Sequence, residues 1–368
     1  MSKNRQFQVL IKTVLGFENI VKNRIKEIDP SADVLVAPKG FKGLVLAGSN
    51  AFDKDKFVKV LNKELIEAEK IIPIDLIVRA DPNEICKGIS GFVNEKISSD
   101  ETFAVRTTRR GRHKFTSIDV NIIVGDCVRK YTGASVNLRY PDKIVLVEII
   151  GEEAYISILP GSFEYHKYAP EKKELYRFFN KLSIIQMPYL GPIESVIEIG
   201  KRIGREVQNF EVKELVIAPI GLVDAYSLAR FIDSVMEGIE SRYRVQVKSY
   251  HRKPRKTPVY IMDLYQLIRD RGDEVIIVFE PEGRYIVDVK DELEELVLKS
   301  RKRINLLFGA REGIPTGIFR YADLVIDIAP GMVLSTDYAV AAGLIALSTI
   351  LYDKYRSMDH ESINTSGR

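Results

Sequence analysis

The chain is poor in cysteine and contains no long apolar run. Cys86 and Cys127, about 40 positions apart, are its only cysteines, and neither a CxxC pair nor a histidine cluster accompanies them. We therefore expect no disulfide framework and no metal site. The longest apolar run, 339–347, is too short to cross a bilayer, and the N-terminus lacks the apolar core of a signal peptide. These absences predict a soluble, cytoplasmic protein.

Two common nucleotide-binding signatures are also missing. GxGxxG and GxxxxGK do not occur, which excludes a dinucleotide fingerprint and a P-loop. The length of 368 residues predicts two or three domains, and 45% hydrophobic residues are enough for packed cores. The net charge of +4 comes from 55 basic and 51 acidic residues, so any strong basicity is local. A basic patch on a nearly neutral body suits a selective RNA binder.

Carboxylates are absent from residues 102–118, where cations are dense. Several such cations on a phosphodiester backbone release counterions, which gives strong, salt-dependent binding. We predict RNA contacts here; a solvated basic turn is the alternative. A second cluster, 248–256, is predicted in a loop between a strand and a helix, and it suits RNA contact and a solvated loop equally well. The predicted RNA-binding residues are Arg106, Arg109, Arg110, Arg112, His113, Lys114, Arg252, Lys253, Arg255 and Lys256.

The first half of the chain is predicted to form two α/β modules. Residues 1–74 combine two strand-like segments, 7–14 and 33–46, with two helical patterns, 17–28 and 56–70, which we assign to a ferredoxin-like domain. The second module, 75–162, begins with a strand and a helix capped by Asp81, with Pro82 at its first position and Glu84 completing a capping box.

The second module continues with a strand, the basic loop and another helix. That helix should begin at Thr116 or Ser117 with Asp119 near its N3 position. Val120, Val124, Cys127, Val128 and Tyr131 fall on one face of it, which makes Cys127 a core residue in this interpretation. Two strands follow, with turns at 141–142 and 151–152.

The order VRTTRRGRHKFTS, amphipathic helix, NLRYPDKIVLVEI and AYISI resembles the THUMP domain, an RNA-binding α/β module. The resemblance implies docking to tRNA, commonly at its acceptor end, with a catalytic domain attached elsewhere. Some catalytic partners of THUMP domains are excluded by missing motifs. An SGGxDS-type loop for sulfur transfer and a DPPY-like or NPPY-like tetrapeptide for a Rossmann N-methyltransferase do not occur, and two cysteines are too few for a zinc deaminase.

The C-terminal half, after an aromatic connector at 163–190, alternates helices and strands over 191–352. This pattern predicts a parallel sheet covered on both faces, with ligands at the carboxyl ends of its strands. Three predicted loops, 279–285, 308–317 and 328–336, combine glycine and proline, as suits backbone that approaches a small ligand closely. Residues 353–368 read as a polar, frayed tail.

The segment INLLFGAREGIPTGIFRYADLVIDIAPGMVLSTDYAVAAGLIAL resembles the cofactor-binding end of SPOUT methyltransferases, which carry a C-terminal trefoil knot. The resemblance implies S-adenosylmethionine held by backbone groups of the three loops, and a homodimer that buries the last helix. The cofactor contacts expected are Phe279, Glu280, Pro281, Gly309, Gly313, Ile328, Pro330, Gly331, Leu334 and Ser335.

Auxiliary catalytic roles are assigned to Arg230, Arg311, Glu312 and Asp337, although Asp337 also suits a helix cap. Arg230 matches the family's catalytic arginine only weakly. The Glu312 turn has one extra residue, and LSTDYAV replaces an Asn-containing motif, so the substrate chemistry stays open. The leading hypothesis is an S-adenosylmethionine-dependent tRNA methyltransferase; the rival is a noncatalytic RNA-binding adaptor with an inactive SPOUT-like domain.

Overall fold

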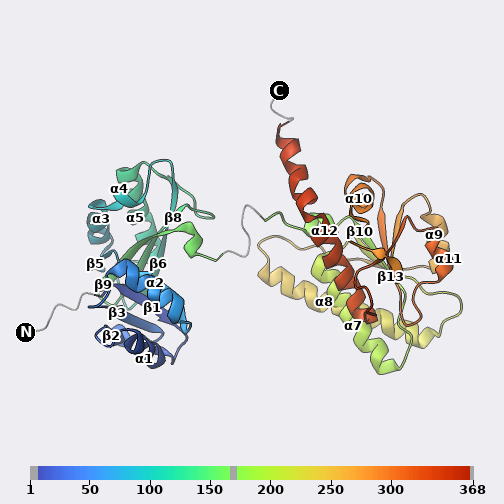
Figure 1. Ribbon diagram of the computed structural model, residues 1–368, viewed down its shortest axis with the longest axis horizontal. Coiled ribbons are helices and arrows are strands. Elements are labelled where there is room, and N and C mark those ends of the chain that lie inside the picture. The colour runs from blue at the N-terminus through green and yellow to red at the C-terminus, as the bar shows by residue number, and fades with distance from the viewer. Residues whose placement is uncertain (1–6, 166–171, 365–368) are drawn as a thin grey trace, which may run out of the picture. The chain divides into compact units, whose positions relative to one another are not determined.

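The computed structural model describes residues 7–165 and 172–364. The chain divides into two compact units, Met1–Lys172 and Lys173–Arg368 (Figure 1). Within the described ranges, every helix is too short or too polar to cross a membrane.

The first sheet of the N-terminal unit has the ferredoxin-like strand order β2-β3-β1-β4 and is antiparallel. Its elements are β1 (Val9–Thr13), α1 (Glu18–Ile28), β2 (Asp33–Val36), η1 (Pro38–Gly40), β3 (Leu44–Gly48), α2 (Lys54–Glu64) and β4 (Ala68–Pro73). Side chains alternate between the faces of a strand, so Val9 and Ile11 pack under the helices while Leu10 faces the other way. The helix predicted at 56–70 ends at Glu64, because the chain turns there into β4.

The second sheet has the order β5-β9-β8-β6-β7, with α3 and α5 packed on one face. Its elements are β5 (Leu76–Arg79), α3 (Pro82–Ser90), α4 (Val93–Lys96), β6 (Thr102–Arg110), α5 (Ser117–Thr132), β7 (Ser135–Val136), β8 (Lys143–Ile150) and β9 (Glu153–Pro160), and the turn η2 (Gly161–Phe163) follows. Strand β8 is buried on both faces. Val145 and Val147 face the helices, whereas Ile144 and Leu146 pack against the first sheet, so both sheets share one compact unit.

Local capping signals are largely confirmed. Thr116 and Asp119 form a reciprocal capping box at the start of α5, and Asp81 accepts hydrogen bonds from the first turn of α3. The carboxylate of Glu84 bonds to Lys87 instead of completing a box. The predicted buried face of α5 is correct except for Tyr131, which is 42% exposed.

The expectation of no disulfide is wrong. Cys86 of α3 and Cys127 of α5 are joined by a disulfide, with their Cα atoms 5.8 Å apart. Cys127 does lie in the core, but its neighbour there is the other cysteine. The spacing of the cysteines along the chain could not show this, because only the packing of α3 beside α5 brings them together.

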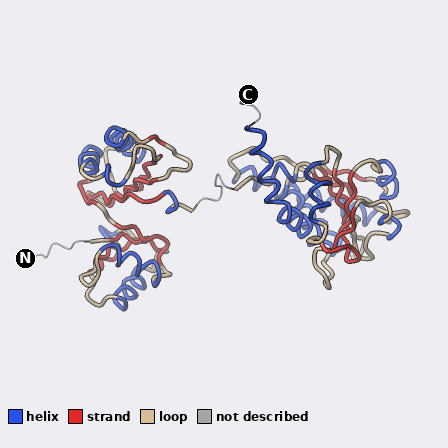
Figure 2. Tube along the Cα trace, turned by 45° about the horizontal axis from the view of Figure 1, so that its top comes forward, coloured by secondary structure: helices blue, strands red, loops and turns tan. Residues whose placement is uncertain are grey.

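The C-terminal unit contains a six-stranded parallel sheet of order β12-β11-β10-β14-β13-β15. Its strands are β10 (Leu182–Gln186), β11 (Glu214–Ile217), β12 (Val259–Ile261), β13 (Val275–Tyr285), β14 (Ile304–Phe308) and β15 (Leu324–Asp327). The helical segments are α6 (Tyr176–Phe179), α7 (Ile193–Phe210), α8 (Ala225–Ser249), α9 (Leu264–Asp270), α10 (Lys290–Leu293), η3 (Glu294–Lys299), α11 (Thr316–Phe319) and α12 (Thr336–Asn364) (Figure 2).

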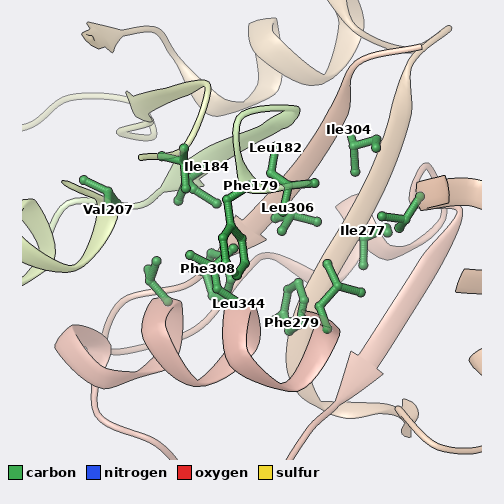
Figure 3. Packing of buried hydrophobic residues seen from close by; sticks show 14 of the residues in the cluster. Phe179, Leu182, Ile184, Val207, Ile277, Phe279, Ile304, Leu306, Phe308 and Leu344 are labelled. Atoms are coloured by element: carbon green, nitrogen blue, oxygen red, sulfur yellow. The ribbon is translucent and has the colours of Figure 1, made fainter. Parts of the chain in front are cut away.

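Both faces of this sheet are buried, as its near-continuous apolar strands predict. Ile184 and Leu306 belong to a core shared with α7, α8 and α12, whereas the next residues, Ile185 and Leu307, pack against α9 and α11. Figure 3 shows the first of these cores, where Leu344 of α12 lies beside the rings of the sheet. The α/β fold class with a parallel sheet is confirmed; the trefoil knot stays a prediction.

Four local predictions in this half are wrong. Residues 182–186, placed in a connector, form the central strand β10, and 353–364 continue α12 instead of fraying. The second cluster, predicted to follow a strand, follows the long helix α8, which ends at Ser249. Residues 279–285 belong to β13, whose pairing with β15 is irregular between Phe279 and Arg284, and not to a free loop. In β10, in β13 and at the end of α8, pairing or packing with distant residues overrides the local pattern.

Candidate functional site

A pocket of about 270 Å³ lies where β14 and β15 end and β13 becomes irregular. Three segments far apart in sequence form its walls: 279–282, 309–313 and 326–339. These segments overlap the three ligand loops predicted from the sequence. Of the predicted cofactor contacts, Phe279, Glu280, Pro281, Gly309, Gly313, Ile328 and Leu334 line the pocket. Pro330, Gly331 and Ser335 lie in the segment 328–336 but do not line it.

The Glu280 carboxylate is built into the pocket wall. Its Oε1 accepts a hydrogen bond of 2.6 Å from the backbone N–H of Ile314. Glycine is required beside it, because a Cβ atom at Gly309 would collide with Oε1 and one at Gly313 would lie 3.1 Å from it. Burial raises the pKa of Glu280, and the hydrogen bond from Ile314 offsets this only in part.

The side chain of Gln186 supports the backbone of the pocket wall, and we did not predict this role from the sequence. Its side chain is fully buried at the end of β10, and its Nε2 donates to the carbonyls of Phe308 (3.3 Å) and Gly309 (3.1 Å). These bonds hold the strand end from which the 309–313 wall begins. The available signal was an amide at the end of the mainly apolar segment LSIIQ, since a buried polar group needs partners.

The structure brings two of the four predicted catalytic residues to the pocket. Arg311 and Glu312 line it, and Arg311 has a left-handed backbone with φ 54°. The Nη1 of Arg311 donates to the carbonyl of Leu190 at 3.3 Å. Arg230, on α8, does not line the pocket.

Asp337 also lies outside the pocket lining, at the start of α12. Its Oδ2 accepts a hydrogen bond of 2.9 Å from Arg202 of α7. Burial acts to raise the pKa of Asp337, but hydrogen bonds from Arg202 and Ser335 outweigh it and leave that pKa below its usual range. This ionised pair ties α12 to α7, which favours the structural alternative for Asp337.

The cations of the first basic cluster, residues 106–114, have different surroundings in the structure. Strand β6 extends to Arg110, so Arg109 and Arg110 do not belong to a loop. Arg110 pairs at 2.8 Å with the buried carboxylate of Glu148, which also pairs with Lys12 of the first sheet. Arg106 pairs with Glu164 at 3.2 Å.

The turn after β6 carries the cations that face solvent. Arg109 bonds to His113 at 3.1 Å, and the ring of His113 bonds to the carbonyl of Gly151 at 2.6 Å. Arg112 and Lys114 are exposed. These two side chains are therefore the ones best placed to meet a phosphate.

The second cluster is largely engaged within its own domain. It lies between α8 and β12, after a helix and not after a strand. Arg252 forms a bidentate ion pair with Glu211 and stacks on Tyr176. Arg255 donates to the carbonyl of Lys213, and Lys256 pairs with Glu240. Lys253 is exposed. These contacts account for most of the charge without RNA.

Models of known protein families match both units of the chain. The model of the family described as AF2226-like SPOUT RNA methylase fused to THUMP matches residues 176–368, and the THUMP domain model matches 79–159. The chain belongs to this family of THUMP-fused SPOUT RNA methylases. The basic turn and α5 therefore lie in the THUMP domain, and the pocket lies in the SPOUT domain.

This THUMP–SPOUT protein is similar to other proteins over most or part of its length. An uncharacterized protein of Methanocaldococcus jannaschii is 41% identical over 340 residues, which cover 92% of each chain. A tRNA sulfurtransferase of Desulfurococcus amylolyticus is 37% identical over 87 residues, 24% of this chain and 18% of its own. A tRNA (guanine(6)-N2)-methyltransferase of M. jannaschii is 40% identical over 70 residues, 17% of this chain and 18% of its own.

Proposed function

We propose that this protein is an S-adenosylmethionine-dependent methyltransferase that acts on tRNA. The THUMP domain binds the RNA, and the SPOUT domain holds the cofactor in the pocket at the ends of β14 and β15. The observation that carries the proposal is this pocket, because it lies in the domain that matches a SPOUT RNA methylase. The two short tRNA-modifying relatives support tRNA as the substrate class.

The lining fits such a cofactor. Backbone rather than side chains forms the wall at Gly309 and Gly313, where a ligand can approach peptide groups closely. Ile326, Ile328 and Met332 supply apolar surface. When bound, the cofactor supplies a methyl group that its sulfonium already activates. The chain positions the RNA nucleophile and can accept its proton, and Arg311 and Glu312, on the pocket lining, are the candidates for these roles.

Titration calorimetry tests the cofactor proposal directly. We expect the protein to bind S-adenosylmethionine at micromolar concentration, as enzymes commonly bind their substrates. Bulk tRNA incubated with methyl-labelled cofactor should then acquire label. Absence of binding up to millimolar cofactor would favour the noncatalytic adaptor, while binding without transfer would point to a different RNA substrate.

RNA binding should depend on the exposed cations of the turn after β6. Replacing Arg112 and Lys114 by alanine should weaken bulk tRNA binding and lower the slope of log K against log salt by about 1 to 2, because each lost phosphate contact lowers it by about 1. Filter binding over a salt series measures both quantities. The matched control replaces Arg129 and Lys130, exposed at the far end of α5, and should leave the slope as it is. If the turn variant and the wild type have the same slope, the RNA-binding surface lies elsewhere.

We also propose that the protein forms a homodimer through the SPOUT domain. Buried residues of α12 such as Leu344 and Leu347 face the sheet, whereas Tyr338 is 63% and Ile345 54% exposed. Met332 and Val333, in the segment that leads into α12, are also exposed. An apolar surface of this kind is typical of one covered by another subunit.

A further inference from the structure

Glu280 is a carboxylate with one oxygen satisfied and the other open to the pocket. Oε1 is held by the N–H of Ile314, whereas Oε2 has no hydrogen-bond partner among the side chains and backbone of the described residues. Oε2 is also not one of the fully buried atoms without a partner, so it is accessible from the pocket that Glu280 lines. A ligand that fills the pocket removes water from Oε2, and this costs free energy unless the ligand brings a donor of its own.

Among the described residues, no lysine or arginine forms an ion pair with this carboxylate. Arg311, which lines the same pocket, is bonded to the carbonyl of Leu190, and Arg284 of the same strand pairs with Glu292. The negative charge of Glu282, two residues further along the strand, repels the Glu280 carboxylate and raises the pKa of Glu280 further. When a ligand fills the pocket and excludes water, the donor for Oε2 therefore has to come from that ligand.

The hydrogen-bond donors of the proposed cofactor limit which part of it can bind Oε2. A sulfonium carries no N–H or O–H group, so it cannot donate a directional hydrogen bond. The ribose hydroxyls and the adenine amine of the nucleoside can donate, and the apolar lining beside Glu280 suits the nucleoside's flat base. The amino-acid end has an ammonium donor, but no feature of the lining selects that end.

Resting on the proposed function, we propose that Glu280 Oε2 accepts a hydrogen bond from the nucleoside part of the cofactor and thereby determines which ligands the pocket binds. Gly309 and Gly313 are part of this arrangement, because a side chain at either position would press on the carboxylate. The side-chain amide of Gln186 donates to the carbonyl of Gly309 and so fixes the backbone of the same pocket wall. Glu280 is then a specificity-determining residue, and the methyl-transfer step does not require it as a base.

The test is calorimetry with three ligands that share the nucleoside: S-adenosylmethionine, S-adenosylhomocysteine and 5′-methylthioadenosine. In Glu280→Gln the amide oxygen can keep the bond from Ile314, while the NH₂ group turns a donor toward the ligand. All three affinities should fall by a similar factor, about tenfold or more, as expected for a lost hydrogen bond to a charged group. Glu194→Gln removes the same charge from an exposed position of the SPOUT domain that does not line the pocket, and it reports the effect of charge alone.

Several outcomes would overturn the assignment. Loss confined to S-adenosylmethionine would place Glu280 at the sulfonium, and loss for both amino-acid ligands but not 5′-methylthioadenosine would place it at the ammonium. Unchanged affinities with methyl transfer abolished would make it a proton acceptor. If wild type binds none of the three ligands, the proposed function fails along with the inference. Should Glu280→Gln not fold, Glu280→Asp, which withdraws the carboxylate by one methylene, is expected to weaken the three ligands together.

Discussion

Replacing Cys86 and Cys127 by alanine should lower the free energy of unfolding of the N-terminal unit by about 4 kcal/mol. The disulfide joins α3 to α5 across a sequence separation of 41 residues, so it removes a large share of the conformational freedom of the unfolded chain. Denaturant titration of the N-terminal unit within the full chain, followed by circular dichroism, measures the difference.

Wild-type protein in a thiol reductant is the matched control for this prediction. Its stability should fall to nearly that of the double alanine variant, and the variant should not respond to the reductant. Two titratable thiols in native protein purified without reductant would show that the bridge does not form. The turn that we propose to bind RNA lies after β6 in the same domain, so loss of the bridge should also make RNA binding more sensitive to temperature.

Alanine at Gly204 should destabilise the SPOUT domain by about 3 kcal/mol, at the upper end of the usual cost of overpacking. Helices α7 and α8 approach closely at glycines, and a Cβ atom at Gly204 would lie 2.8 Å from the carbonyl carbon of Val235 and 3.0 Å from its Cα. Those are backbone atoms, which cannot rotate away as a side chain can. The two helices must therefore separate, which disturbs the core that they share with the sheet.

Gly317→Ala, in α11, is the control for Gly204→Ala. A Cβ atom there meets nothing within 4 Å, so the change should be neutral or slightly stabilising. Thermal unfolding of both variants tests the comparison. Equal melting temperatures for Gly204→Ala and wild type would show that α7 and α8 are not packed as closely as described.

Prediction from the sequence succeeded where the determinants are local. The start of α5 follows from Thr116 and Asp119, three positions apart, because a capping box involves only neighbouring residues. The alternation of apolar strands with helices predicted a parallel sheet with both faces covered, since parallel strands need helical crossovers. The three segments predicted as ligand loops do line one pocket, because such sheets place it at strand ends; that they hold a ligand stays a prediction.

Prediction failed where partners are distant in sequence. Strand β10 looked like a connector because its place in the sheet depends on pairing with β11 and β14. The cations at 252, 255 and 256 looked available for RNA, but Glu211 and Glu240 engage two of them from other helices or loops. Charge along a chain does not show which carboxylates the fold will bring beside it.

By itself, the sequence determined the class of this protein: an α/β chain with a THUMP-like RNA-binding module and a SPOUT-like domain, since periodicity, capping and motif order are properties of neighbouring residues. Only the tertiary structure decided which of those residues act together. It joined Cys86 to Cys127, paired Arg110 with Glu148, and placed Glu280 between two glycines with one oxygen open to the pocket. Hydrogen bonds and packing act over a few ångströms in space, whatever the separation along the chain.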